Sequence, residues 1–306
     1  MKRKRDGLLY CPDDVGEVDR VTIAEAQAAA AARNRNDDRE VARLETVRPD
    51  APDVIYGDNL VAWYRSDSVT RSQGQLSVVA DKTGNGNDLT SSGSPVYTPT
   101  GDASMNYTPS IALDGTDDYA QKASGFSLGA SDFTVYLLTK VNDWNDTDGV
   151  RLISMWEGPN GDDNFSLLRL LQSPKRWDFY TANDPEYVTV SSTTSVDDAN
   201  PHLLRMHVDS TNNVLGLGID GATPTTATWT GTNPTLKKFV LGSGFTQSIF
   251  SAQTFKECFV VNAISTSAQD AKVFAYIRDL YAMTIAGVAG AGQAVRHYTT
   301  GAAAGL

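Results

Sequence analysis

The chain has 306 residues, of which 41% are hydrophobic and 21% are charged, a balance that excludes a wholly disordered protein. Its formal net charge of −11 argues against a nucleic-acid-binding protein. No run approaches about 18 uninterrupted apolar residues, so no membrane-spanning helix is expected.

Residues 1–54 are predicted to form an arm outside the main domain. The first fifty residues hold ten Lys and Arg and eleven Asp and Glu, with no Trp or Phe and with Tyr10 as their one aromatic residue. Such a segment cannot bury enough apolar surface to form its own core. Its basic start, 1–5, is followed by acidic residues and Cys11 rather than by an apolar stretch, which argues against a secretory signal peptide.

Within this arm, residues 22–48 are predicted to form a helix. Thr22 and Glu25 fit a capping box, an alanine-rich run follows, and Pro49 and Pro52 end the pattern. The large apolar residues of the helix form a thin stripe that we expect to be an assembly contact: Ile23, Val41, Leu44 and Val47. A solvated spacer helix is the alternative.

From about residue 55, short β-rich runs alternate with Gly, Asn, Asp, Ser and Pro clusters, a pattern typical of an antiparallel sandwich or barrel. Turn dipeptides such as Asp220-Gly221 supply the positive φ that tight turns need. The predicted strands are 59–65, 75–80, 110–114, 118–122, 132–141, 150–156, 164–171, 175–181, 186–191, 202–209, 213–219, 236–242 and 255–264.

One further helix is predicted over about 267–283, where apolar residues recur at intervals of three and four. The tail, 284–306, is rich in Gly, Ala and Thr. The expected fold is therefore all-β: an antiparallel two-sheet jelly-roll sandwich over 55–283, with the arm before it and one short C-terminal helix.

Several segments in this order resemble the concanavalin A-like lectin/glucanase (laminin-G-like) jelly rolls. NLVAWYRSDSV, VVADKTGNGNDLT, PSIALDGTDDYAQ and DFTVYLLTKV look like the opening strands of those domains. FKECFVVNAISTSAQDAKVFAYIRDLY is similar to their final strand and short helix. Domains with this signature behind an N-terminal extension resemble those displayed on tailed-phage virions, an analogy at the level of fold.

The resemblance includes glycosidases, but the chain lacks the acidic pattern that they use. Hydrolysis of a glycosidic bond needs two carboxylates about 5–10 Å apart. Glu157, Glu186 and Glu257 are the only glutamates after residue 50. None of them alternates with a second acidic residue along its strand, as the pattern Glu-x-Asp-x-x-Glu requires. We therefore expect no enzyme activity.

Two further motifs are interpreted as loop and hairpin. Residues 125–129 match G-x-S-x-G, but a strand rather than a helix follows them. Residues 216–221 match the dinucleotide fingerprint inside a strand that ends in a turn. His202, His207 and His297 show no spacing typical of a catalytic triad.

Trp144 and Trp229 lie in polar loops and are the candidate carbohydrate-binding residues, since a ring can stack on a sugar. A lid over the sandwich edge is the alternative for both. Trp63, Trp156 and Trp177 lie within strands and are expected in the core.

No cofactor is expected and no metal site is assigned. Calcium bound by turn aspartates is the alternative, and its candidate ligands are Asp81, Asp114, Asp117, Asp118, Asp162 and Asp163. With two cysteines a disulfide framework is excluded, and Cys258 is expected to pack as a small hydrophobe.

These observations predict a non-enzymatic virion structural protein of the capsid decoration, cement or fibre type. Its arm would contact other virion or assembly subunits, and its lectin-like jelly roll would face outward and could touch surface glycans. Neither nucleic acid nor membrane is an expected partner, and a homo-oligomer is expected. The alternative is an extracellular carbohydrate-binding module or adhesin, and a glycoside hydrolase ranks third.

Overall fold

The computed structural model describes residues 2–3, 9–10, 51–101, 103–143, 150–158, 164–172, 175–183, 186–193, 200–244 and 249–283. The chain divides into two compact units, Met1–Pro49 and Asp50–Leu306. The described part of the first unit is a short antiparallel pair, β1 (Lys2–Arg3) and β2 (Leu9–Tyr10). The helix predicted over 22–48, with Ile23, Val41, Leu44 and Val47, lies outside the described residues, as do Cys11, Trp144, His297 and the tail 284–306.

The second unit is an antiparallel β-sandwich. One layer, here called the covered layer, is built from β3 (Leu60–Ser72), β6 (Val96–Thr98), β7 (Ser110–Asp114), β9 (Phe133–Val141), β14 (Pro201–Asp209), β15 (Val214–Ile219), β16 (Thr225–Thr228) and β18 (Ala252–Val261). The other, here called the open layer, is built from β8 (Tyr119–Lys122), β10 (Val150–Trp156), β11 (Asn164–Gln172), β12 (Lys175–Asn183), β13 (Glu186–Ser191) and β17 (Lys238–Leu241).

Two strands, β4 (Gln75–Asp81) and β5 (Leu89–Ser92), connect the layers by pairing with β3 and β8 respectively. The hydrogen-bonded path then runs from β13 at one end to β16 at the other, and these two end strands contact each other. The predicted all-β sandwich with one C-terminal helix is thereby confirmed.

The predicted strands agree with the structure to within a few residues, except that β3 continues to Ser72, well beyond its predicted end at 65. The short strands β5, β6 and β16 are additional to the predicted ones. These additional strands carry few large apolar residues, so the alternation that marks a strand is weak in them.

Two hydrophobic clusters lie on opposite sides of the covered layer. The main cluster fills the sandwich, with Leu137 of β9 and Cys258 of β18 from the covered layer and Trp177 of β12 from the open layer. Burial raises the pKa of the Cys258 thiol, which packs as the predicted small hydrophobe. The second cluster lies on the outer side, where neighbouring residues such as Tyr136 and Phe259 point away from the sandwich interior.

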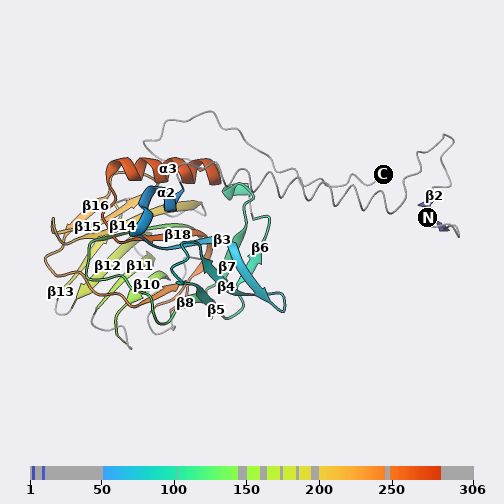
Figure 1. Ribbon diagram of the computed structural model, residues 1–306, viewed down its shortest axis with the longest axis horizontal. Coiled ribbons are helices and arrows are strands. Elements are labelled where there is room, and N and C mark those ends of the chain that lie inside the picture. Colours follow the sequence, from blue (N-terminus) through green and yellow to red (C-terminus); the bar gives the residue numbers. More distant parts are fainter. Residues whose placement is uncertain are drawn as a thin grey trace. The chain divides into compact units, whose positions relative to one another are not determined.

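Two helices cover that outer side: α2 (Pro52–Tyr56) and α3 (Ser267–Tyr281). Figure 1 shows α3 running along the layer that holds β14 and β18, with α2 beside it. Thr266 and Gln269 form a capping box at the start of α3, which confirms the predicted helix near its expected bounds.

A short 3₁₀ turn, η1 (Gly57–Asn59), leads from α2 into β3, and a second, η2 (Ala103–Met105), precedes β7. In the described part of the chain, no helix is long and apolar enough to cross a membrane.

Candidate functional site

Trp229 is completely buried, so its predicted exposure in a loop is wrong. Its ring belongs to the main hydrophobic cluster, and its Nε1 donates a hydrogen bond to Oδ1 of Asn233 at 3.0 Å. Asn233 in turn donates to Asp132 at 3.0 Å, which fixes the loop after β16 over the end of the sandwich. The ring therefore has no free face for a sugar, and the alternative of a lid fits the structure. The three tryptophans that were predicted for the core, Trp63, Trp156 and Trp177, are buried as expected.

The three glutamates of the sandwich have separate roles. Glu157 forms an ion pair with Lys237 at 2.9 Å, and Glu186 is exposed at the start of β13. Glu257 is buried in β18 and accepts hydrogen bonds from Trp63 Nε1 at 2.6 Å, Tyr276 OH at 2.8 Å and Tyr281 OH at 2.6 Å.

Glu257 therefore serves as an anchor for α3. Burial raises the pKa of its carboxyl group, while Arg65 and the three donors lower it. Because Tyr276 and Tyr281 both belong to α3, one carboxylate fixes the C-terminal half of the helix to the sheet. A carboxylate that is fully buried and bonded to three side chains has no room for a substrate.

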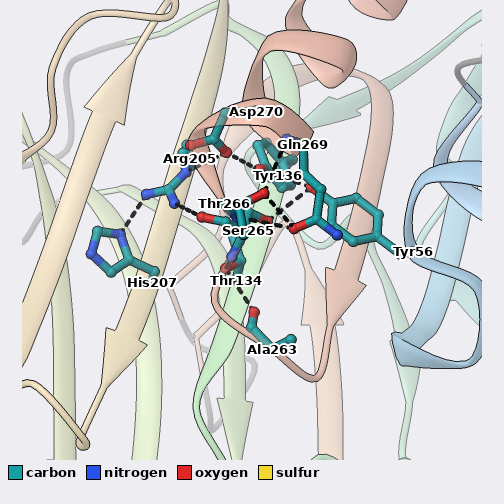
Figure 2. A network of polar contacts seen from close by, with 10 residues as sticks. All are labelled: Tyr56, Thr134, Tyr136, Arg205, His207, Ala263, Ser265, Thr266, Gln269 and Asp270. Carbon is teal, nitrogen blue, oxygen red and sulfur yellow. Dashed lines mark hydrogen bonds and ion pairs between the residues drawn. The ribbon is translucent and has the colours of Figure 1, made fainter.

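A second polar network fixes the other end of α3 (Figure 2). Tyr56 of α2 donates to Tyr136 at 3.0 Å, and Tyr136 donates to Asp270 of α3. Asp270 also accepts from Arg205 Nε at 2.8 Å. Four elements, α2, β9, β14 and α3, are joined by this network, so it holds the two helices on the covered layer.

His207 lies at the edge of this network, with its Nδ1 2.7 Å from Arg205 Nη1. Burial and the positive charge of Arg205 lower the pKa of His207 to about 4, so the ring is neutral at pH 7. A Cβ on Gly216 would lie 1.9 Å from its Cε1, which explains the glycine at this position of β15. The fingerprint around Gly216 therefore reflects packing inside a strand, as predicted.

The G-x-S-x-G match is a loop between β8 and β9, as predicted. Phe126 and Leu128 are buried on either side of the exposed Ser127, and β9 follows rather than a helix. His202 pairs with Asp220 at 2.7 Å. Among the described residues, these groups do not form a nucleophile with its base.

Of the candidate calcium ligands, the structure brings together Asp114, Asp117 and Asp118, whose carboxylate oxygens lie within 4.8 Å of one another. Two of these carboxylates accept backbone hydrogen bonds: Asp118 from Ser94 N at 2.6 Å and from Asp114 N at 3.1 Å, and Asp114 from Thr116 N at 2.7 Å. Asp81 accepts from the backbone of other residues, and Asp162 and Asp163 lie outside the described residues.

The outer face of the open layer carries a further group of aromatic and charged side chains. In β12, Trp177 and Phe179 belong to the main cluster, so the alternating Arg176, Asp178 and Tyr180 point to the outer face.

The same alternation applies to the strands on either side of β12. In β11, Leu168 and Leu170 point inward and Phe165 and Arg169 outward. In β13, Val190 points inward and Tyr187 outward. The aromatic and charged residues among the outward positions of these three strands form one surface, here called the aromatic face: Phe165, Arg169, Arg176, Asp178, Tyr180 and Tyr187.

The rings of the aromatic face form a connected set. Phe165 stacks on Tyr180 with centroids 5.1 Å apart and planes at 26°, and Tyr187 lies 5.8 Å from Tyr180. The guanidinium of Arg169 lies over the Tyr180 ring at 5.7 Å. Tyr187 is 67% exposed, whereas Phe165 and Tyr180 are half-buried, so the set presents ring surface to solvent.

Both arginines of the aromatic face are fixed by one buried carboxylate. Asp178 is completely buried and accepts from Arg169 Nη2 at 3.3 Å and from Arg176 Nε at 3.1 Å. The side chains of Arg169 and Arg176 keep 27% and 36% of their surface exposed. The guanidinium groups thus cover Asp178 and keep further N–H groups available.

The aromatic face was absent from the sequence prediction, which located sugar contacts in loops. A signal was present: the β12 sequence KRWDFYTAN alternates core residues with Arg, Asp and Tyr rather than with small polar residues. Whether these side chains form one surface depends on the residues that lie opposite them in β11 and β13, and the sequence does not show the register of the strands.

No protein-family profile and no curated protein sequence matches the chain. Similar solved structures include the binding domain of botulinum neurotoxin DC in complex with rat synaptotagmin II, with a TM-score of 0.52 and 11% identity over 72% of this chain and 52% of that one. The same binding domain in complex with SialylT gives a TM-score of 0.53 and 9% identity over 73% and 52%. A sialidase of Trypanosoma rangeli gives 0.52 and 15% over 83% and 39%.

This chain matches only about half of the length of the toxin binding domains and less of the sialidase. At these identities the similarity shows a shared fold alone. What the chain has in common with toxin binding domains and a sialidase is therefore a β-sandwich fold.

Proposed function

We propose that this protein is a non-catalytic glycan-binding module whose ligand lies on the aromatic face. The observation that carries the proposal is the exposed, connected ring set of Phe165, Tyr180 and Tyr187 on the outer side of the open layer. Aromatic rings stack on the apolar faces of sugar rings, while nearby guanidinium and carboxylate groups bind hydroxyl groups.

The arrangement of the carboxylates favours binding over catalysis. Hydrolysis needs an acid and a second carboxylate on either side of one bond. On the aromatic face Asp178 is buried beneath two arginines, and Glu257 is bonded within the covered layer. The described residues therefore offer no acid–base pair in contact with the rings.

The fold similarity is in keeping with this proposal but does not carry it. The botulinum neurotoxin DC binding domain is described in a complex with SialylT, and that ligand belongs to that protein.

A glycan array tests the proposal. The full chain should bind a restricted set of glycans, and Tyr187→Ala should weaken that binding by about tenfold. Tyr107→Ala is the matched control, since Tyr107 is an exposed tyrosine on a different part of the domain. The same glycans should release no reducing ends on incubation with the protein. Absence of binding, or equal loss in both variants, would contradict the proposal.

A second proposal concerns the first fifty residues, which we infer to be the anchor of a structural subunit in a larger particle, such as a virion. The observation in favour is the division of the chain into Met1–Pro49 and Asp50–Leu306. Both hydrophobic clusters are built from residues between Ala51 and Met283 as far as the structure describes them. Among the described residues, the core of the sandwich thus contains none of the first fifty, and we infer that this segment binds a partner.

Deletion of residues 1–50 tests this anchor. The truncated chain should unfold cooperatively and keep its glycan binding, but it should no longer join an oligomer or a particle. Normal assembly of the truncated chain would refute the anchor, and failure to fold would show that the arm belongs to the sandwich.

A further inference from the structure

The aromatic face has an unusual charge for this chain. The protein carries a net charge of −11. Yet on the outer side of β10, β11, β12, β13 and β17, strand alternation and register place four basic side chains, Arg151, Arg169, Arg176 and Lys238, against one acidic side chain, Asp178. A local excess of positive charge on a negative protein favours the binding of an anionic group at this face.

The two arginines nearest the rings are positioned rather than neutralised. Asp178 offers one negative charge to two guanidinium groups, so a net positive charge remains. Each arginine contacts Asp178 through a single nitrogen. Arg169 Nε is buried and has no hydrogen-bond partner among the described residues. Because Asp178 holds both side chains in place, less conformational entropy is lost when a ligand binds them.

The donors and the rings lie side by side. Arg169 lies over Tyr180, and Tyr180 contacts both Phe165 and Tyr187. Planar guanidinium groups bind carboxylates through paired N–H donors, and the rings beside them stack on a sugar. A single molecule that satisfies both groups is a saccharide that bears a carboxylate.

We infer that the ligand of the aromatic face is a glycan with a carboxylate-bearing sugar, a sialic or uronic acid, whose carboxylate is bound by Arg169 and Arg176 while a sugar ring stacks on the tyrosines. This inference rests on the proposed glycan-binding function. We expect this glycan to carry few acidic sugars among neutral ones, because the net charge of −11 repels a dense polyanion.

Matched oligosaccharide pairs test this inference on the full chain by calorimetry. The pairs are sialyllactose with lactose and glucuronoxylotetraose with xylotetraose, so that each pair differs by one acidic sugar. The acidic member of one pair should bind at least about tenfold more tightly than its neutral partner. The pair that shows the difference distinguishes a sialic from a uronic acid.

Three variants locate the effect. Arg169→Gln should abolish the preference for the acidic member, and Arg169→Lys should keep part of it, since a lysine retains the charge but not the paired donors. Arg71→Gln is the matched control, because Arg71 lies over Tyr97 at 5.3 Å in the same kind of contact but away from the aromatic face. If Arg169→Gln fails to fold by near-ultraviolet circular dichroism, Arg176→Gln replaces it, with the same loss expected.

The outcomes separate the inference from the function it rests on. Equal binding of acidic and neutral members, lost in Tyr187→Ala, would overturn the inference and leave the glycan-binding function intact. Absence of binding to any member, and to the array, would overturn both. Tighter binding of a heparin hexasaccharide or of oligo-dT than of the acidic oligosaccharides would overturn the inference in favour of a polyanion site.

Discussion

The two outer faces of the sandwich differ in what covers them. The outer side of the covered layer is packed beneath α2 and α3, and its aromatic residues Tyr136 and Phe259 are buried with ring centroids 4.7 Å apart. The outer side of the open layer also presents stacked aromatic residues, yet Tyr187 there is 67% exposed. Similar side chains therefore serve stability on one face and remain available to a ligand on the other.

The polar groups follow the same division. Glu257 on the covered layer is bonded to three side chains that hold α3. Asp178 on the open layer holds two arginines that stay partly exposed. A buried carboxylate thus anchors a helix in one case and presents cations in the other, and substitutions on the two faces should affect different measurements.

The largest expected effect is on the covered layer. Glu257→Ala leaves the donors of Trp63, Tyr276 and Tyr281 buried without an acceptor, so the free energy of unfolding should fall by about 4 kcal/mol. Urea denaturation measures this loss. Glu186→Ala, an exposed glutamate on the open layer, is the control and should change stability by less than about 0.5 kcal/mol. Similar losses in both variants would remove the distinction between the faces.

Trp229→Ala distinguishes the loop from the aromatic face as the ligand site. Because the ring is buried in the main cluster, the change should cost about 3 kcal/mol or more of unfolding free energy. In a folded preparation at low temperature, glycan affinity should stay close to that of the unmodified chain. A stable Trp229→Ala variant that no longer binds the glycan would show that the binding site lies in the loop.

Acidification should weaken the covered layer through His207. Its native pKa of about 4 lies below the ordinary value of 6.5, so the unfolded chain binds the proton first and stability falls as pH drops from 6.5 towards 4. Between pH 7 and pH 5 the expected loss is about 2 kcal/mol. Burial raises the pKa of Glu257, which acts with the opposite sign.

The His207→Gln variant isolates this contribution in urea denaturation at both pH values. The unmodified chain should lose about 2 kcal/mol more than the variant over this range. An identical pH dependence in the two proteins would show that His207 is not buried in the neutral form.

The smallest effect on stability is expected at Tyr187. Its ring is mostly exposed, so Tyr187→Ala should alter the free energy of unfolding by no more than about 0.5 kcal/mol while it weakens glycan binding about tenfold. Thermal unfolding and calorimetry on the same preparation measure both quantities. A large loss of stability would place Tyr187 in the sandwich core rather than on a ligand surface.

The sequence predicts the strands well because their signals are local. β9 reads FTVYLLTKV, and its apolar residues on both faces match a strand covered on both sides. α3 has a capping motif and regular apolar spacing within a few residues. Alternation and capping need no knowledge of distant parts of the chain.

The sites depend on distant contacts and were predicted less well. Trp229 lies in a polar loop in sequence, and its burial follows from bonds through Asn233 to Asp132, about a hundred residues away. Likewise, Tyr180 belongs to a connected ring set only because Phe165 and Tyr187 lie beside it on neighbouring strands. Strand register and loop closure are set by the whole fold.

Chemical-shift mapping of the isotope-labelled chain, titrated with the tightest glycan from the array, tests the central claim most directly. If the aromatic face is the binding surface, the backbone amides that shift will cluster in β11, β12 and β13, with the largest changes near Tyr180 and Tyr187. Shifts confined to α3, to β18 or to the loop around Trp229, with those three strands unchanged, would contradict the claim.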